Sequence, residues 1–261
     1  MSVYLSLLDQ NGILEGRKVA LVGATASQAT YEIAQAELSA LGVEVVLEAL
    51  SEITVGDTEA EDAWWDVMAE RVRSAGADSI LMAGGDRAAL RNLFWAGIEL
   101  DIFIMNSETL GSMSSSVTPE MAVGAITLTG LTPQEQFETV SSQTNCIAPF
   151  EAAHPEIVVG TPDTHEDGIE KWWRSILTHC NQLRMFELIA TKAGPILTHD
   201  TFREAAATMS QFRLPLSPYA SLSAEKVDAD DSFRLSVFDG SASAGEDGLL
   251  TPMGPVLDGT P

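Results

Sequence analysis

Short apolar runs alternate with amphipathic segments over the first part of this 261-residue chain. The runs are rich in β-branched residues and cover residues 18–23, 43–47, 78–83 and 101–106. Between them, apolar positions recur at spacings of three and four, as in Tyr31, Ala34 and Leu38, which is the period of a helix. Such alternation predicts an α/β fold, a parallel sheet with crossover helices on both faces. Sheets of this kind bind ligands at the carboxyl ends of their strands.

The second half of the chain has a different pattern. A fifth strand is predicted at residues 123–129, after a polar loop that includes residues 111–116. Residues 133–212 then have mostly helical periodicity, with a long helix expected at 167–193. One later strand is predicted at 233–238, followed by a tail that we expect to be solvated. The helical block has apolar stripes but no sheet, so it either forms an independent bundle or covers a sheet outside this chain.

The chain is strongly acidic, with 38 acidic and 14 basic side chains and a formal net charge of −24. This charge argues against nucleic acid or an anionic membrane surface as a partner, because both are polyanionic. No apolar run approaches the roughly 20 residues that cross a bilayer, so no direct membrane insertion is expected. The acidic stretch at residues 57–62 is expected to be a solvated loop.

The two cysteines, Cys146 and Cys180, both lie in the helical block. They can form a disulfide if the segment before Cys146 packs on the long helix that carries Cys180. Two buried free thiols in a cytosolic protein are the alternative. The residues by themselves leave both interpretations open.

Polar residues follow three of the predicted strands. They are Ser27 and Gln28 after the first, Gly85 and Asp86 after the third, and Asn106 and Glu108 after the fourth. The Ser27 hydroxyl and the free amides of a helix start can bind a small ligand, although Ser27 can also act only as a helix cap. Asp86 likewise can contact a ligand or can act only as the cap of the helix that follows it. The Asn106–Glu108 stretch is the strongest single candidate for ligand contact, because it places three polar residues at one strand end.

Motifs for catalysis are weak. The first strand is followed by neither the GxGxxG nor the GxxxxGK[ST] pattern of a phosphate loop, and no GxSxG or CxxC motif occurs. The histidines lie in the helical half and lack the spacing of the helical zinc motif. We therefore expect no enzyme, no cofactor and no metal site. A cytosolic, Rossmann-like α/β enzyme is the competing interpretation.

Three stretches, RKVALVGATASQATYEIAQAELSALGVEVV, DVMAERVRSAGADSILMAGG and FIMNSETLG, resemble a known family in their order and spacing. They are similar to the second lobe of type I periplasmic binding proteins, and more narrowly to the branched-chain amino acid (Leu/Ile/Val) family of ABC-transporter substrate-binding proteins. The segments around Cys146 and Cys180, together with THDTFREAA and FRLSVF, are similar to the family's later helices and late strand. The resemblance covers nearly the whole chain.

This resemblance implies a three-layer parallel-sheet lobe of a type I periplasmic-binding fold plus a helical C-terminal part. The implied regions are a lead-in helix at 1–16, a second-lobe α/β domain at 17–130, returning helices of the first lobe at 131–220, and a late strand with a solvated tail at 221–261. The family begins with a signal peptide and a first-lobe sheet, and the resemblance finds neither here. The chain is therefore expected to be the C-terminal portion of such a protein.

The resemblance also implies a function, namely non-catalytic binding of a small solute, an amino acid or similar, for ABC-type import by hinge closure of two lobes. The expected partners are the solute and an ABC permease. The expected location is extracytoplasmic, which favours a disulfide between Cys146 and Cys180. A ligand-sensing domain of a receptor or regulator uses the same lobes and is an alternative.

Ligand-facing positions of the family match residues at the three strand ends. They are Ser27, Gln28, Gly85, Asp86, Asn106 and Glu108. The family often has a tyrosine near the position of Gln28, and Tyr31 is the candidate for its role.

Overall fold

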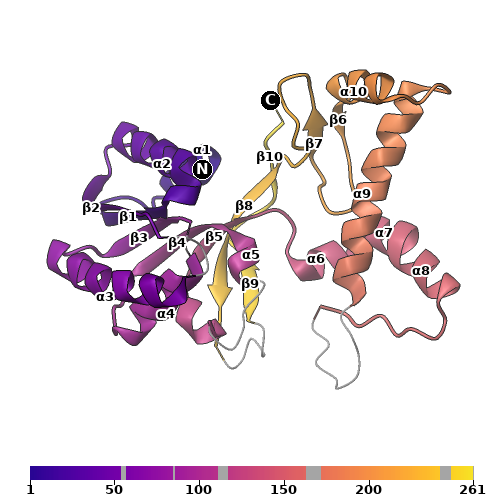
Figure 1. Cartoon of the computed structure of the whole chain (residues 1–261). Coiled ribbons are helices and arrows are strands. Elements are labelled where there is room, and N and C mark those ends of the chain that lie inside the picture. Colours follow the sequence, from indigo (N-terminus) through magenta and orange to yellow (C-terminus); the bar gives the residue numbers. More distant parts are fainter. Residues whose placement is uncertain (54–56, 85, 111–116, 163–171, 242–247, 261) are drawn as a thin grey trace. The chain divides into compact units, whose positions relative to one another are not determined.

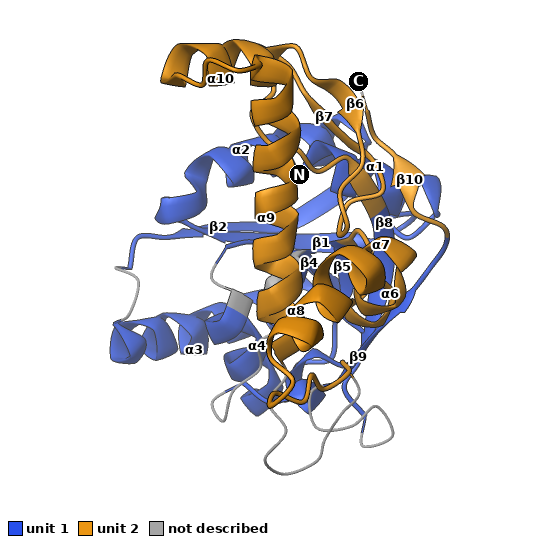
Figure 2. Cartoon of the chain, turned by 90° about the vertical axis from the view of Figure 1, so that its right-hand side faces the viewer, with its two compact units in different colours: residues 1–128, 234–254 blue, residues 129–233, 255–261 orange. Residues whose placement is uncertain are grey.

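The computed structural model describes residues 1–261 except 54–56, 85, 111–116, 163–171, 242–247 and 261 (Figure 1). The chain divides into two compact units (Figure 2). Unit 1 contains residues 1–128 and 234–254, and unit 2 contains residues 129–233 and 255–261. The chain therefore passes from one unit to the other three times.

Unit 1 is an α/β layer structure. Its helices and 3₁₀ turns are α1 (Ser2–Gln10), η1 (Thr25–Ser27), α2 (Gln28–Ala40), α3 (Thr58–Ala75), α4 (Asp86–Trp95), α5 (Ser107–Leu110) and η2 (Pro119–Ala122). Its strands are β1 (Lys18–Ala24), β2 (Glu44–Ser51), β3 (Ser79–Ala83), β4 (Asp101–Asn106) and β9 (Leu249–Pro252), together with most of β5 (Ile126–Thr129) and β8 (Ser232–Asp239). The order in the sheet is β8-β5-β4-β3-β1-β2, and β9 pairs with β8 in antiparallel fashion.

Strands β2, β1, β3, β4 and β5, which are neighbours in this order, run parallel, as the alternating sequence pattern predicts. Successive side chains of β1 point to opposite faces of the sheet. Ala20 and Val22 belong to the core cluster that also includes Met68 of α3 and Leu90 of α4. Helices α1 and α2 lie on the other face (Figure 1), where α2 contacts β1. The expected α/β fold with helices on both faces is confirmed.

Two local expectations for unit 1 are wrong. The acidic stretch 57–62 is not a loop but the start of α3, because Asp57 caps the helix by accepting a hydrogen bond from the Ala60 amide. Acidic side chains are also favoured there by the positive end of the helix dipole. The fifth strand begins at Ile126 and not at residue 123, and η2 precedes it. The polar loop at 111–116 lies outside the described residues.

Unit 2 is mainly helical. Its elements are α6 (Pro133–Glu138), α7 (Val140–Ser142), the π-helical turn η3 (Gln143–Ile147), α8 (Ala148–Ala153), α9 (Trp172–Ala193), α10 (His199–Ala207), β6 (Ser210–Phe212), β7 (Ala220–Leu222) and β10 (Leu257–Asp258). Strands β6 and β7 form an antiparallel pair, and β10 pairs with the first residues of β8. The start of the expected long helix, residues 167–171, lies outside the described part of the chain.

The disulfide between Cys146 of η3 and Cys180 of α9 is present, with a Cα–Cα distance of 5.7 Å. This confirms the pairing that the resemblance favours. Cys146 belongs to a small core cluster with Ile147, Trp173 and Leu177. The bridge therefore ties the short helices to α9 beside one of the cores of unit 2.

The described residues after β8 include two strands that the sequence does not indicate. Strands β9 and β10 occur where a solvated tail is expected, and both are largely exposed. Strands of two to four residues have too few positions to show an alternating pattern, so their order comes from pairing with β8. Among the described residues, no helix combines the length and the apolar character needed to cross a membrane.

Candidate functional site

The candidate site is the edge of the unit 1 sheet at which its parallel strands end. Strand β3 lies between β1 and β4, with Gly23 opposite Ala83 and Met82 opposite Ile104. The polar residues that follow these strands are therefore brought to the same edge of the sheet, as the sequence predicts.

Ser27 and Gly84 form the closest approach at this edge. A Cβ atom placed on Gly84 would lie 2.6 Å from Oγ of Ser27 and 2.9 Å from its Cβ, and Gly84 has a φ of +101°. Both the backbone conformation and the space therefore require glycine at this position. The Ser27 side chain makes no capping hydrogen bond to α2, although Ser27 is the residue before that helix. The interpretation of Ser27 as only a helix cap is thus not supported, and its half-buried side chain lies at the strand ends.

Two neighbouring polar side chains form hydrogen bonds to other groups of the protein. The Thr25 hydroxyl donates a hydrogen bond of 2.7 Å to the Ser51 carbonyl at the end of β2, which holds η1 against the sheet. The exposed Gln28 amide donates to the Glu32 carboxylate one turn along α2, at 2.8 Å. In this structure Gln28 is therefore paired along its own helix.

Tyr31 is buried, with 8% of its surface exposed. Its ring lies over Gly23, where a Cβ atom would approach Cδ2 of the ring to 2.8 Å. Burial raises the pKa of the Tyr31 phenol, and the nearby Glu48 carboxylate adds to the rise. Tyr31 therefore stays neutral near pH 7 and supports the end of β1 from within the helix–sheet layer.

The other predicted site residues have defined places in the chain. Asp86 is the first residue of α4, Asn106 is the last residue of β4, and Glu108 lies in α5. Gly85 and the side chains of these three residues lie outside the described part of the structure. Asn106 and Asp86 nevertheless belong to the elements that end or begin at the edge where Ser27 lies.

The sequence alone does not show whether Gly84 or Gly85 makes the close backbone approach. The two adjacent glycines indicate close approach of the backbone, but only the conformation shows that Gly84 is the one beneath Ser27. Among the described residues, no group of His, Cys, Asp and Glu side chains is arranged to hold a metal ion.

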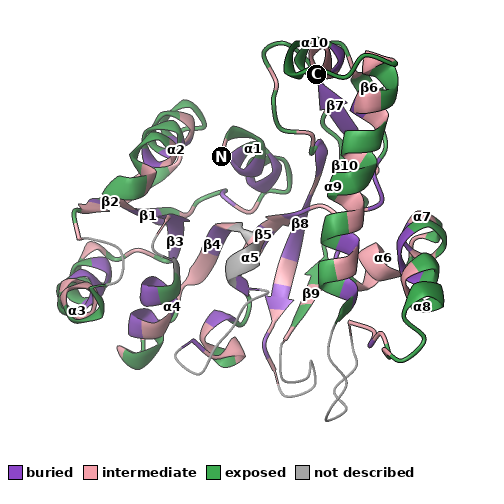
Figure 3. Ribbon diagram, turned by 45° about the vertical axis from the view of Figure 1, so that its right-hand side comes forward, coloured by how far each residue is buried: buried purple, intermediate pink, exposed green. Residues whose placement is uncertain are grey.

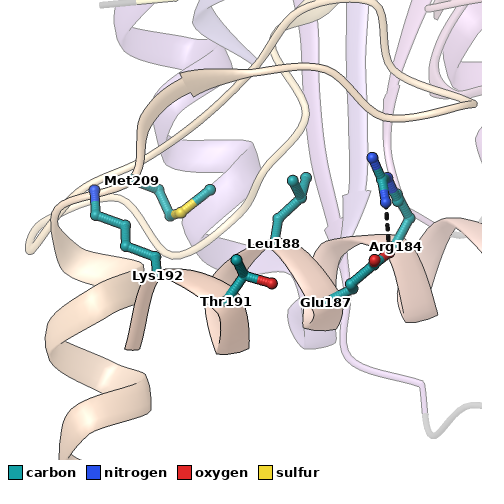
Figure 4. A pocket seen from close by; sticks show the side chains of 6 residues that line it. All are labelled: Arg184, Glu187, Leu188, Thr191, Lys192 and Met209. Carbon is teal, nitrogen blue, oxygen red and sulfur yellow. Dashed lines mark hydrogen bonds and ion pairs between the residues drawn. The ribbon is translucent and has the colours of Figure 1, made fainter. Parts of the chain in front are cut away.

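The described part of unit 2 contains hollows, of which two are considered. The larger has a volume of about 1200 Å³ and runs along α9 beside the disulfide. The smaller, of about 380 Å³, is lined by Arg184, Glu187, Leu188, Thr191, Lys192 and Met209 (Figure 4). The sequence indicated apolar stripes on the helical block but not these hollows.

Comparison with solved structures identifies proteins of similar fold. A leucine-, isoleucine-, valine-, threonine- and alanine-binding protein from Brucella ovis matches 99% of this chain at 14% identity, with a TM-score of 0.63. A branched-chain amino acid ABC transporter protein from Thermus thermophilus with bound valine matches 98% at 14% identity, with a TM-score of 0.64. This chain has the type I periplasmic-binding fold. At such low identity the likeness establishes the fold alone.

Other proteins with this fold have different solutes. A solute-binding protein of an ABC transporter from R. palustris, in complex with 4-hydroxybenzoate, matches 100% of this chain at 14% identity, with a TM-score of 0.64. No protein-family model matches the chain, and no curated protein does. The chain spans only 62% of the length of the Brucella protein and 64% of that of the R. palustris and Thermus proteins. More than a third of each of these periplasmic-binding folds thus has no counterpart in these 261 residues.

Proposed function

We propose that this chain provides one lobe of a substrate-binding protein that captures a small solute for import by an ABC transporter. The observation that carries the proposal is the carboxyl edge of the unit 1 sheet, where Ser27 lies over Gly84. This is the part of an open parallel sheet that binds ligands. The type I periplasmic-binding fold, shared with several solute-binding proteins, supports a binding role rather than catalysis.

The proposed mechanism is closure of two lobes around the solute. A solute that gains contacts only in the closed state shifts the equilibrium towards closure. We propose that the second-lobe half of the site consists of Ser27, Gln28, Tyr31, Gly85, Asp86, Asn106 and Glu108. In this set Ser27 contributes a hydroxyl to the solute, while the buried Tyr31 supports the strand end behind it.

We also propose that the working protein extends beyond these 261 residues and contains a further lobe. The support is the length of the solved proteins, more than a third of which this chain does not match. We place the protein outside the cytoplasm, where it delivers solute to an ABC permease. The Cys146–Cys180 disulfide supports this location, because such bonds persist in oxidising compartments.

The solute class is best tested with the compounds that proteins of this fold are known to carry. These are leucine, isoleucine, valine, threonine and alanine, 4-hydroxybenzoate, and a fatty acid. Each would be titrated by calorimetry into the full product of the gene, with thermal unfolding as a second readout. A solute at one hundred times its Kd is expected to stabilise the protein by about 2.7 kcal/mol.

Two variants locate the site. Ser27→Ala is expected to weaken binding by up to about tenfold, the loss of one hydrogen bond. Ser39→Ala, at the exposed far end of the same helix, is the matched control and should bind as the parent does. If the parent and both variants bind the solute with equal affinity, Ser27 is not part of the site. Failure of every compound to bind the full gene product would reject the proposed solute classes, and binding of a nucleotide with turnover would favour an enzyme.

A further inference from the structure

The acidic side chains of this protein are concentrated at one end of the unit 1 sheet. Residues 19–70 contain 11 Asp and Glu side chains and neither lysine nor arginine. This stretch includes α2, β2 and most of α3, and both helices contact β2. Strand β2 is the last strand at its end of the sheet order. We call the surface formed by these 11 side chains the acidic edge.

The charges of the acidic edge face the solvent. Eight of the 11 belong to exposed residues and the other three to partly exposed ones. Figure 3 shows the outer sides of α2 and α3 as largely exposed. Arg91 pairs with Asp62, and Arg73 pairs with Glu70. Both arginines come from outside the stretch, so the stretch itself supplies no cation to its other carboxylates.

The excess of negative charge extends over both units. Unit 1 has 22 acidic and 7 basic side chains, and unit 2 has 16 acidic and 7 basic ones. If every lysine and arginine paired with one carboxylate, 24 carboxylates would still lack a cation. A net charge of about 2–8 already keeps a small domain soluble. Solubility by itself therefore does not account for a charge of −24.

Like charges at this density oppose folding. Each carboxylate is well hydrated by itself, but the compact state brings many of them close together, and their mutual repulsion destabilises it. On the acidic edge, Glu44 and Glu48 project from the same side of β2. The field of Glu48 extends inwards, since burial raises the pKa of the Tyr31 phenol and the Glu48 charge adds to the rise. Salt weakens such repulsion, because the Debye length falls from about 10 Å at 0.1 M to about 3 Å at 1 M.

We infer that this protein is adapted to concentrated salt and reaches its full stability only there. Dissolved cations, spread over the surface and not held at one site, screen the repulsion within the acidic edge and over the rest of the chain. In a dilute medium the folded state is destabilised by its own charge. Salt dependence of this kind involves neither the solute nor a further lobe, so it stands apart from the proposed function.

The test is urea unfolding of the full gene product at about 0.1 M and at about 1 M KCl, the range over which the Debye length shortens roughly threefold. We expect the unfolding midpoint to be higher at the higher salt concentration. Hydrogen exchange of β2 and α3 peptides should slow at the same time, because the acidic edge lies on these elements.

Two triple variants make the test specific to the acidic edge. Glu44→Gln with Glu52→Gln and Asp66→Asn removes three exposed charges and preserves the side-chain shapes. At the lower salt concentration its folded-to-unfolded ratio is expected to exceed that of the parent by roughly three- to tenfold, the relief of a few like-charge contacts. At the higher concentration the two proteins should differ less. The matched control, Glu44→Asp with Glu52→Asp and Asp66→Glu, retains every charge and should retain the salt dependence of the parent.

Three results would overturn the inference. The first is an unfolding midpoint that does not rise between the two salt concentrations. The second is a rise of equal size in the parent and in the neutralised variant, which would assign it to a general effect of salt on apolar burial. The third is a neutralised variant that is less stable than the parent at the lower salt concentration, because the three charges would then stabilise the fold.

Discussion

Replacing Gly84 by alanine is expected to disturb the candidate site. The new Cβ would lie 2.6 Å from Oγ of Ser27 and 2.9 Å from its Cβ. The hydroxyl can rotate away, but the Ser27 Cβ is fixed to the backbone of η1, so that backbone must move. In addition, the φ of +101° at Gly84 is one that residues with a side chain rarely adopt. Such backbone strain costs about 1–3 kcal/mol.

The two contributions can be separated with two further variants. Gly42→Ala introduces the strain alone, because Gly42 has a φ of +70° and open space around the position of a Cβ. The double variant Ser27→Gly with Gly84→Ala removes the clash and retains the strain. We therefore expect Gly84→Ala to cost more than Gly42→Ala, and the Ser27→Gly change to recover about 0.5–3 kcal/mol, the usual coupling energy of two residues in contact.

The measurement is urea unfolding of the full chain, with hydrogen exchange of β1 and β3 peptides to localise the effect in unit 1. A midpoint that falls while the slope stays constant reports a loss of stability. The solute affinity of the full gene product should fall with Gly84→Ala and recover in part in the double variant. If Ser27→Gly does not change the cost of Gly84→Ala, then Ser27 does not lie over Gly84, and the geometry proposed for the site is wrong.

The remaining predictions concern the disulfide and two ionisable side chains. Reduction of the Cys146–Cys180 bond, which spans 34 residues, is expected to lower stability by about 4 kcal/mol and to speed hydrogen exchange in unit 2 but not in unit 1; equal exchange in both redox states would contradict this. Although Asp230 is exposed at the surface, partial desolvation of its carboxylate raises its pKa, so its charge costs a small amount of stability as the pH rises above the ordinary value of 3.8. Asp230→Asn should therefore be more stable than the parent at pH 7 and equal to it at low pH, and an Asp230→Asn protein that is less stable at pH 7 would show that the carboxylate is needed. Tyr31→Phe keeps the buried ring and should unfold close to the parent, whereas loss of solute binding in that variant would assign the phenol a direct contact.

The parallel sheet could be predicted from the sequence because its strands are buried on both faces. All five residues of β3 are buried, and they form an uninterrupted run from Ser79 to Ala83. The helices between the strands likewise repeat their apolar positions with the helical period, as Tyr31, Ala34 and Leu38 do. Each of these signals is local, so it survives without knowledge of the tertiary structure.

The strand ends were only partly predictable. The sequence places Ser27 and Asn106 after parallel strands, and topology brings such residues to one edge. It does not show that the Gln28 amide is used by Glu32, or that the Tyr31 ring turns inwards over Gly23. Those outcomes depend on distances between side chains, which a one-dimensional pattern does not contain.

The two long helices α3 and α9 differ in the residues that they expose to solvent. Helix α3 buries Trp65 and Met68 against the sheet and presents Asp66 and Glu70 to solvent. A charged outer face of this kind is stable in water.

The outer face of helix α9 is mixed. It exposes Leu183 and Phe186 along the groove of about 1200 Å³, together with the charged pair Arg184 and Glu187. Single exposed apolar residues need no explanation, but a stripe continued over several turns along a groove does, because patches of that size mark interaction sites.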